Sequence, residues 1–298
     1  MIKKEPNYKF QRTSQPYRFM TPALFVLIIL MVYPIFKVFY YSFFDNVITN
    51  PDPHFVGLKN YKKIIFDPIF RSSLFHTLYF TVFSVIFHMF IGLGFAMLLN
   101  AHINSVIRSL CRIMFVLPWL FTATVISLIW KLILEPGGIF NYMLKTLELI
   151  PKGIEWFGSE KTALGSLTFA NIWAGYPFYM ISILASLQAV PEAEYEAALL
   201  DGVNGWQKFW YVTFPHLIPV LLSLSLLDFI WTMQVFPLVW TTTGGGPGHA
   251  TEMLSTYTYK LTFHQYEFAL ASTSAIIIFL ISLILSIYYS KRQTAIAE

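Results

Sequence analysis

Cysteine is almost absent from this sequence: Cys111 is the only one among 298 residues. A single thiol excludes an internal disulfide and a metal site built from several cysteines. The seven histidines are scattered, with no pair at metal-binding spacing, so we expect no metal site. Charge is also scarce, at 12% of residues against 56% hydrophobic. That balance lies outside the range of soluble globular proteins and is typical of membrane proteins.

Phosphate-binding and catalytic patterns are missing as well. The chain contains no Gly-x4-Gly-Lys-Ser/Thr, and the glycines at 244–246 lack a following lysine. The apolar runs hold no clustered histidines and carboxylates that could serve as a metal or acid–base site. We therefore expect no catalytic residue, no cofactor bound by this chain and no ATP hydrolysis by it.

Six long apolar runs and the loops between them account for nearly the whole length. A helix needs about 20 mostly apolar residues to cross a bilayer. The runs are roughly Pro22 to Phe44, Leu74 to Leu99, Ile113 to Leu134, Ala163 to Leu187, Leu217 to Thr241 and Phe268 to Tyr289. The first run ends in aromatics rather than a small-residue cleavage site, so we interpret it as a retained helix and not a signal peptide. The predicted fold class is an all-α, polytopic membrane protein with six transmembrane helices.

The distribution of basic residues gives an expected orientation. The twenty lysines and arginines divide evenly between the two sides, but short loops and the first helix carry the most weight. Five basic residues before Pro22 and the pairs Arg108/Arg112 and Lys291/Arg292 favour a cytoplasmic N-terminus. We expect a cytoplasmic tail at 1–21, a transmembrane domain at 22–290 and a cytoplasmic tail at 291–298, in a bacterial-type inner membrane.

The stretch "EYEAALLDGVNGWQKFWYVTFP" (194–215) is a polar run set between two long apolar stretches. Glu192 and Glu194 fall in a first helical turn, where the helix dipole favours negative charge. Gly202 supplies a left-handed stop, and Asn204 with Gln207 forms a capping-box pattern for a second start. The pattern predicts two short helices separated by a glycine turn, on the cytoplasmic face.

Two interpretations of this stretch are open from its residues alone. Ala197 and Ala198 would allow another backbone to approach closely, and Trp206 and Trp210 are anchors typical of interface centres. Alternatively, the aromatic rings rest on lipid headgroups while the charged side chains face water.

The same stretch resembles the signature loop of permease subunits of binding-protein-dependent ABC importers. Glu196-Ala197-Ala198 is followed by three residues, Gly202, nine residues and then "VTFP" (212–215). The segments "VGLKNY" (56–61), "GGIFN" (137–141), "NIWAGYPF" (171–178), "TGGGP" (243–247) and the closing "ALAST…SKR" resemble the carbohydrate branch, of maltose and multiple-sugar type. Val212, Phe214 and Pro237 depart from the family pattern. Of these, Pro237 is expected to alter the helix near the outer mouth.

The resemblance implies an ABC type I importer permease fold and a set of partners. These are a second homologous permease subunit, a cytoplasmic ATPase dimer that uses ATP and Mg, and an extracytoplasmic sugar-binding protein. The positions that correspond to the ATPase-coupling helix are Glu196, Ala197, Ala198, Asp201 and Gly202.

Two helical stripes are candidates for a sugar path, because each combines polar, small and aromatic side chains. They are Asn171, Ala174, Gly175 and Phe178 in the fourth run, and Asp228, Trp231, Thr232 and Val235 in the fifth. A carboxylate within a membrane helix costs about 2.5 to 3.5 kcal/mol. Three roles are therefore open for Asp228. It accepts hydrogen bonds from sugar hydroxyls, it pairs with a polar group of the second permease, or it is protonated or inconsequential. His88 fits a satisfied packing histidine better than a functional one, and Asn171 could equally pack between helices.

Other functions compete with sugar import. An importer of a phosphorylated polyol or another solute has the same architecture. A standalone secondary transporter would show paired repeats and several intramembrane ionisable groups, neither of which the sequence contains. A membrane enzyme would need an acid–base cluster, which the apolar runs do not contain. We also expect no nucleic-acid partner.

Overall fold

The computed structural model describes residues 19–297, apart from 46 and 102. Within that part of the chain the secondary structure is helical, with one isolated β-bridge between Phe44 and Phe55 and no strand. Six of its helices are long and apolar enough to cross a membrane. They are Phe19–Tyr41, Pro68–Asn100, Ala123–Thr146, Ala163–Gln188, Gly205–Met233 and Phe268–Tyr288. The predicted all-α class with six membrane-spanning helices is confirmed.

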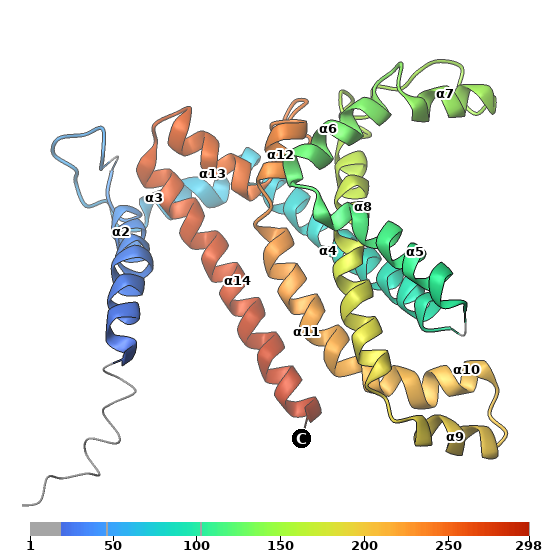
Figure 1. Ribbon diagram of the computed structural model, residues 1–298. Helices are drawn as coiled ribbons and strands as arrows, with labels where there is room; N and C mark the ends of the chain where they lie inside the picture. Colours follow the sequence, from blue (N-terminus) through green and yellow to red (C-terminus); the bar gives the residue numbers. More distant parts are fainter. Residues whose placement is uncertain (1–18, 46, 102, 298) are drawn as a thin grey trace, which may run out of the picture. The chain divides into compact units, whose positions relative to one another are not determined.

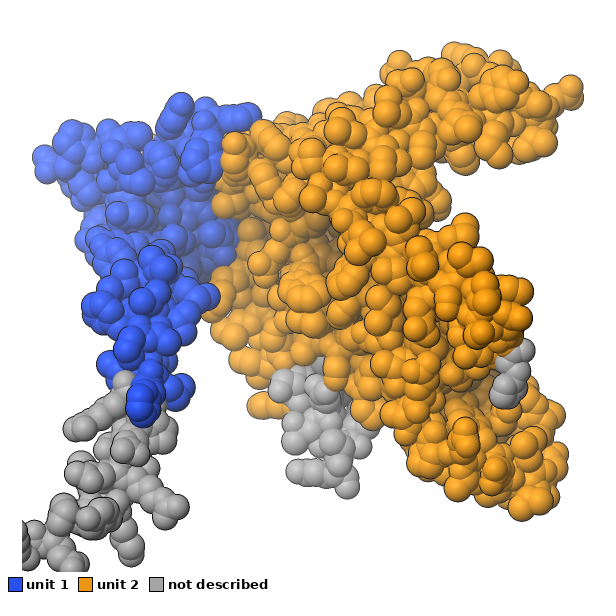
Figure 2. All heavy atoms as spheres, in the orientation of Figure 1, with its two compact units in different colours: residues 1–64, 261–277 blue, residues 65–260, 278–298 orange. Residues whose placement is uncertain are grey.

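The chain divides into two compact units, 1–64 with 261–277 and 65–260 with 278–298 (Figure 2). The first contains η1 (Ile28–Val32), α2 (Tyr33–Tyr41) and most of α3 (Lys59–Phe66), whose last two residues belong to the second unit. Buried Asn60 of α3 donates to the carbonyl oxygens of Ser42 (3.0 Å) and Phe44 (2.8 Å), and Tyr61 bonds the Ser42 hydroxyl. These bonds satisfy the backbone where α2 ends, and they tie α3 to it.

The second unit is built on three long helices that contact one another, α4 (Pro68–Asn100), α8 (Ala163–Gln188) and α11 (Phe214–Met233) (Figure 1). The buried face of α4 carries small and polar side chains, which let its neighbours approach closely. At Gly92 the approach is close, because a side chain there would overlap Tyr179 and the backbone of Met180. Asp67 caps the start of α4 by accepting from the amides of Ile69 and Phe70.

The shorter elements of the second unit complete the chain. They are α5 (Ser105–Val116), η2 (Leu117–Leu120), α6 (Ala123–Leu134), α7 (Ile139–Thr146), α9 (Glu192–Leu200), α10 (Gly205–Lys208), η3 (Phe209–Thr213) and α12 (Pro237–Thr242). Two further helices, α13 (Leu254–Phe263) and α14 (Phe268–Ala297), extend across the division between the units.

Two predicted spans are interrupted in the structure. The run 113–134 is not one helix: α5 ends at Val116, a 3-10 turn follows, and α6 starts at Ala123, capped by Thr122. Pro118 lacks an amide hydrogen, which favours a break at this point. The run 217–241 also stops early, since α11 ends at Met233 and α12 begins at Pro237. The expected effect of Pro237 on this helix is confirmed.

Candidate functional site: a membrane cavity and an exposed helical loop

A cavity of about 300 Å³ lies within the second unit, between α4, α8, α11 and the interrupted segment from η2 to α6. The structure brings together all six residues predicted for the substrate path. Its lining comprises His88, Trp119, Phe121, Ala123, Ile126, Asn171, Ala174, Gly175, Phe178, Asp228, Trp231, Thr232, Val235 and Leu238. The two stripes of the fourth and fifth apolar runs therefore face the same space, as their helical spacing required.

Aromatic rings form one part of this wall. The ring centroids of Phe178 and Trp231 are 5.6 Å apart, and Trp119 approaches Phe178 at 6.4 Å. Trp119 lies in the η2 turn and was not predicted as part of the site. The signal that could have found it is Pro118, because a break in the third apolar run turns neighbouring side chains out of the helical pattern. The three rings offer flat apolar faces to the cavity.

A buried polar cluster forms the opposite part. The carboxylate of Asp228 lies 2.8 Å from Nδ1 of His88, and its second oxygen accepts from the Thr232 hydroxyl at 2.9 Å. His88 is 2% exposed and Asp228 is 7% exposed. The expected satisfied histidine is confirmed, but sequence analysis missed that its partner is Asp228. The requirement that a membrane carboxylate find a partner, together with a histidine near the middle of the second apolar run, could have indicated the pair.

Asn171 contributes a side-chain donor that no described residue uses. Its backbone oxygen lies 3.0 Å from Nε2 of His88, and that ring nitrogen faces only this acceptor. The side-chain nitrogen Nδ2 is buried and has no hydrogen-bond partner among the described residues. Among the described residues, Nδ2 of this amide therefore makes no hydrogen bond to a neighbouring helix. A buried amide without a partner is unfavourable, so a ligand or water that accepts its hydrogen bond would be favoured here.

The polar stretch at 190–215 folds largely as predicted. Helix α9 has Glu192 and Glu194 in its first turn, Gly202 follows in the left-handed region at φ 72°, and Asn204 forms a capping box with Gln207. One expectation was wrong. The second helix is not short and separate, because α10, η3 and α11 form one continuous helical run from Gly205 to Met233. Residues 205–213 were predicted as a separate short helix, but they join α11 without a break.

The loop presents most of its coupling positions to solvent. Glu196, Ala197, Asp201 and Gly202 are exposed, whereas Ala198 is 8% exposed. Ala198 therefore does not belong to a low open surface as its sequence neighbourhood predicted; it packs inward. Large apolar side chains are exposed beside these positions, with Leu200 at 89% and Trp206 at 71%. The rings of Trp206, Phe209 and Trp210 contact one another, with Trp206 and Trp210 at 5.7 Å.

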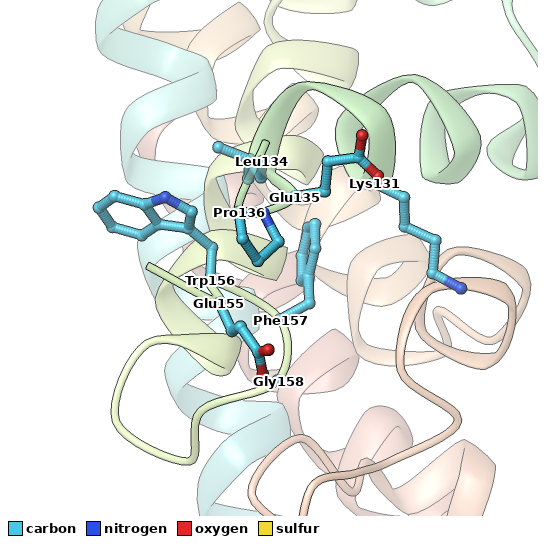
Figure 3. A pocket seen from close by; sticks show the side chains of 8 residues that line it. All are labelled: Lys131, Leu134, Glu135, Pro136, Glu155, Trp156, Phe157 and Gly158. Atoms are coloured by element: carbon cyan, nitrogen blue, oxygen red, sulfur yellow. The ribbon is translucent and has the colours of Figure 1, made fainter. Parts of the chain in front are cut away.

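Two further polar features lie in loops of the second unit. A cavity of about 290 Å³ between 131–136 and 155–158 is lined by Lys131, two glutamates and Phe157 (Figure 3). Buried Asn141 fixes its walls by donating to the carbonyl of Glu135 at 2.7 Å and accepting from the Trp156 indole at 3.2 Å.

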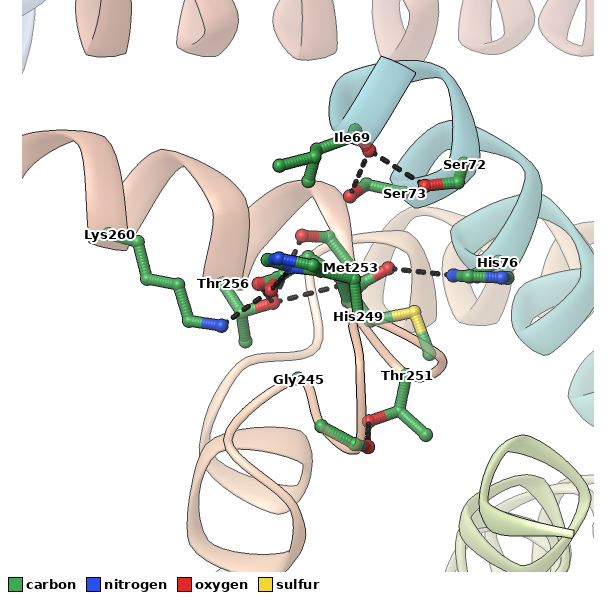
Figure 4. Close-up of polar contacts among 12 residues, drawn as sticks. Ile69, Ser72, Ser73, His76, Gly245, His249, Thr251, Met253, Thr256 and Lys260 are labelled. Atoms are coloured by element: carbon green, nitrogen blue, oxygen red, sulfur yellow. Dashed lines mark hydrogen bonds and ion pairs between the residues drawn. The ribbon is translucent and has the colours of Figure 1, made fainter. Parts of the chain in front are cut away.

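The second feature is buried Glu252, whose partners His249, Thr256 and Lys260 are labelled in Figure 4. Its carboxylate lies 2.5 Å from Lys260 Nζ and 3.0 Å from His249 Nδ1, and it accepts from the Thr256 hydroxyl. It thereby closes the glycine-rich loop against α13.

Comparison with known proteins identifies a matching family. Residues 88–293 match the family described as "Binding-protein-dependent transport system inner membrane component". The trehalose/maltose transport system permease protein MalF of Thermococcus litoralis is 32% identical over 287 residues, covering 95% of both chains. The sulfoquinovosyl glycerol transport system permease protein SmoG of Agrobacterium fabrum is 30% identical over 274 residues, covering 91% of this chain and 88% of that protein.

A solved structure shares the fold. It is a bacterial alginate ABC transporter in complex with a periplasmic protein that holds an alginate pentasaccharide, and one of its chains matches with a TM-score of 0.83. The match covers 96% of each chain at 19% sequence identity, which shows likeness of fold.

Proposed function

The chain belongs to the family of binding-protein-dependent transport system inner membrane components, and from that premise we propose that it is one permease subunit of an ATP-driven sugar importer. In this proposal it forms half of the translocation path and docks on a cytoplasmic ATPase through the loop at 192–204. The chain transports and does not hydrolyse ATP, because a separate ATPase dimer binds ATP and Mg.

One observation carries this proposal: the helices that wall the cavity are the helices that hold the loop. Helix α8 contributes Asn171 and Phe178 to the cavity and ends at Gln188, four residues before α9 begins. Helix α11 contributes Asp228 and is continuous with α10 at the other end of the loop. A displacement of the loop by an ATPase would therefore move both walls of the cavity.

The lining supports an uncharged sugar as substrate. Aromatic faces stack on the apolar side of a sugar ring, while the Asn171 amide can bond its hydroxyls. The lining residues that the structure describes include no lysine or arginine, which disfavours the phosphorylated polyol. Relatives named for trehalose/maltose and for sulfoquinovosyl glycerol, and the fold shared with an alginate transporter, favour a glycoside or oligosaccharide.

The expected partners follow from this architecture. A second, homologous permease supplies the other half of the cavity. An extracytoplasmic sugar-binding protein delivers the substrate, as the periplasmic protein in the alginate complex illustrates for that transporter. Glu196, Ala197, Asp201 and Gly202 contact the ATPase, with Leu200 and Trp206 as exposed apolar anchors. The loop and both chain termini then lie in the cytoplasm, and the protein resides in the cell membrane.

Affinity purification in mild detergent tests the proposal. The tagged wild type is compared with the double variant Glu196→Arg/Gly202→Asp, and co-purifying chains are identified by mass spectrometry. We expect a second six-span protein and a Walker-motif ATPase with the wild type, and loss of the ATPase alone from the variant. Circular dichroism and size exclusion confirm that the variant is folded.

A control variant makes the acid-to-arginine reversal of Glu196→Arg at an acid elsewhere. Asp52 is an exposed acid in the loop between the first two spans, so Asp52→Arg is expected to retain the ATPase. Sugar-stimulated ATP hydrolysis by the purified complex then identifies the substrate class. If the folded wild type purifies without an ATPase, the proposal fails and a standalone transporter becomes the better hypothesis.

A further inference from the structure

His88 lies between two hydrogen-bond acceptors. Its Nδ1 is 2.8 Å from the Asp228 carboxylate and its Nε2 is 3.0 Å from the carbonyl oxygen of Asn171. A carbonyl oxygen only accepts, so Nε2 carries a proton. On the other side the hydrogen bond needs one proton between Nδ1 and the carboxylate. The three groups come from α4, α8 and α11, so the ring links the three long helices of the second unit.

The charge of this pair follows from that geometry. If the proton resides on Nδ1, His88 is an imidazolium and Asp228 a carboxylate. If it resides on Asp228, the acid donates to a neutral ring. In both cases the pair has no net charge, and the two states belong to the pair rather than to either residue. His88 and Asp228 are the only ionisable side chains among the described residues that line the cavity.

Each oxygen of the Asp228 carboxylate has a hydrogen-bond partner within the chain. Asp228 Oδ2 faces His88, and Oδ1 accepts from the Thr232 hydroxyl, which lies one helical turn further along α11. The acid is thereby directed toward α4 and held by two partners within its own chain. None of the three roles weighed for Asp228 named a partner within this chain, and the pairing with His88 and Thr232 fits this arrangement better than a free acceptor for sugar hydroxyls.

We propose that His88 is a positioning residue that compensates Asp228 and so keeps this half of the sugar cavity without net charge. The inference rests on the proposed function for the identity of the ligand, and on the contacts above for the pairing. Removing one partner of a buried pair leaves an uncompensated charge and is strongly unfavourable, whereas replacing both partners can be nearly neutral. The two kinds of replacement therefore separate charge compensation from simple packing.

The test compares His88→Gln with the double variant His88→Gln/Asp228→Asn in the complete complex, reconstituted in proteoliposomes with its binding protein. The single variant is expected to lower uptake of the neutral sugar by at least about tenfold and to lower the unfolding temperature in detergent. The double variant, in which two amides can bond each other without charge, is expected to recover most of both losses. The recovery is the decisive readout, because a residue that merely filled space would not be rescued by a change at 228.

If the double variant is no better than His88→Gln in both measurements, the proposal is overturned. Failure of the proposed function would look different. A wild-type complex that imports no sugar contradicts the assignment as a sugar importer, while the unfolding temperatures of the single and double variants still decide whether His88 compensates Asp228. A second check uses ¹⁵N-histidine NMR. Two protonated ring nitrogens, or a hydrogen-bonded neutral ring with the proton on Nε2, agree with the proposal, and a ring protonated only on Nδ1 contradicts it.

Discussion

The imidazole ring of His88 fills the space that a side chain at Gly175 would need. A Cβ built at residue 175 would overlap the ring carbons and Nε2, and the same close approach lets Nε2 reach the Asn171 carbonyl one turn earlier on α8. Gly175 was predicted as a small residue of the substrate path. The structure gives it a second reason to be glycine, which is to accept the ring of another helix.

Gly175→Ala should therefore destabilise the protein. The added methyl group must displace His88 from both partners, and overpacking of this kind typically costs about 1 to 3 kcal/mol. Gly165→Ala is the matched control, because it lies on the same helix with nothing within 4 Å of its Cβ position. Helix propensity predicts that the control is neutral or slightly stabilising. Thermal unfolding in detergent measures both, and equal unfolding temperatures for the two variants would contradict the packing explanation.

Comparison of sequence and structure shows why the pair was missed. Each stripe could be predicted, because a helical period places Asn171 and Phe178 on one face and Asp228 and Trp231 on another. Which third helix meets them depends on packing between residues 140 positions apart in the chain. Periodicity within one helix contains no information about that contact, so His88 and Asp228 were assigned separate roles.

Some helix boundaries could be predicted from local signals, and others could not. The coupling loop was predicted closely because its signals are local: a left-handed glycine and a capping box act within a few residues. The interruption of the third span was missed, and the fifth was expected to be altered at Pro237 but not to end at Met233, because apolar composition is the same on both sides of a break. Pro118 and Pro237 are the only local marks there, and a proline can equally be accommodated inside a membrane helix.

Gly202→Ala should loosen the coupling loop. Gly202 has φ 72°, and a residue with a Cβ costs roughly 1 to 2 kcal/mol in that conformation. Gly205 lies three residues further along, with no positive φ and open space around it, so Gly205→Ala is the control. Hydrogen exchange of residues 192–204 should become faster in Gly202→Ala only. Unchanged protection would mean that the glycine is not needed for the turn.

Tyr257 should make stability depend on alkaline pH. Burial, and then the nearby Asp67 carboxylate that accepts its hydroxyl at 3.1 Å, raise the pKa of Tyr257 well above its ordinary value of 10.0. The folded state therefore retains the phenolic proton at a pH where the unfolded chain has lost it. Stability from this group is complete below about pH 10 and declines as the pH rises above that value.

Replacing Tyr257 by phenylalanine tests this linkage. The variant loses the hydrogen bond to Asp67, so its unfolding temperature should be lower than that of the wild type at pH 8. The difference between the two proteins should shrink as the pH is raised from 9 to 11. Tyr142→Phe, at an exposed tyrosine of α7, is the control and should follow the wild type throughout. A difference that stays constant over this range would show that the hydroxyl does not respond to pH as its surroundings require.

Lys260 should be needed only while Glu252 carries a charge. The buried carboxylate of Glu252 lies 2.5 Å from Lys260 Nζ, and its other close ionisable neighbour, His249, is half exposed. Lys260→Met leaves the carboxylate poorly compensated and is expected to destabilise the protein by about 3 to 5 kcal/mol, as for other broken buried pairs. Glu252→Gln/Lys260→Met removes both charges and should recover much of that loss. Lys145→Met, at an exposed lysine of α7, controls for the loss of a positive charge alone. Unfolding in detergent ranks the stability of the three variants. If the double variant is the least stable, the prediction is wrong. The loop is then held by hydrogen bonds of Glu252 that glutamine cannot replace, and not by the ion pair.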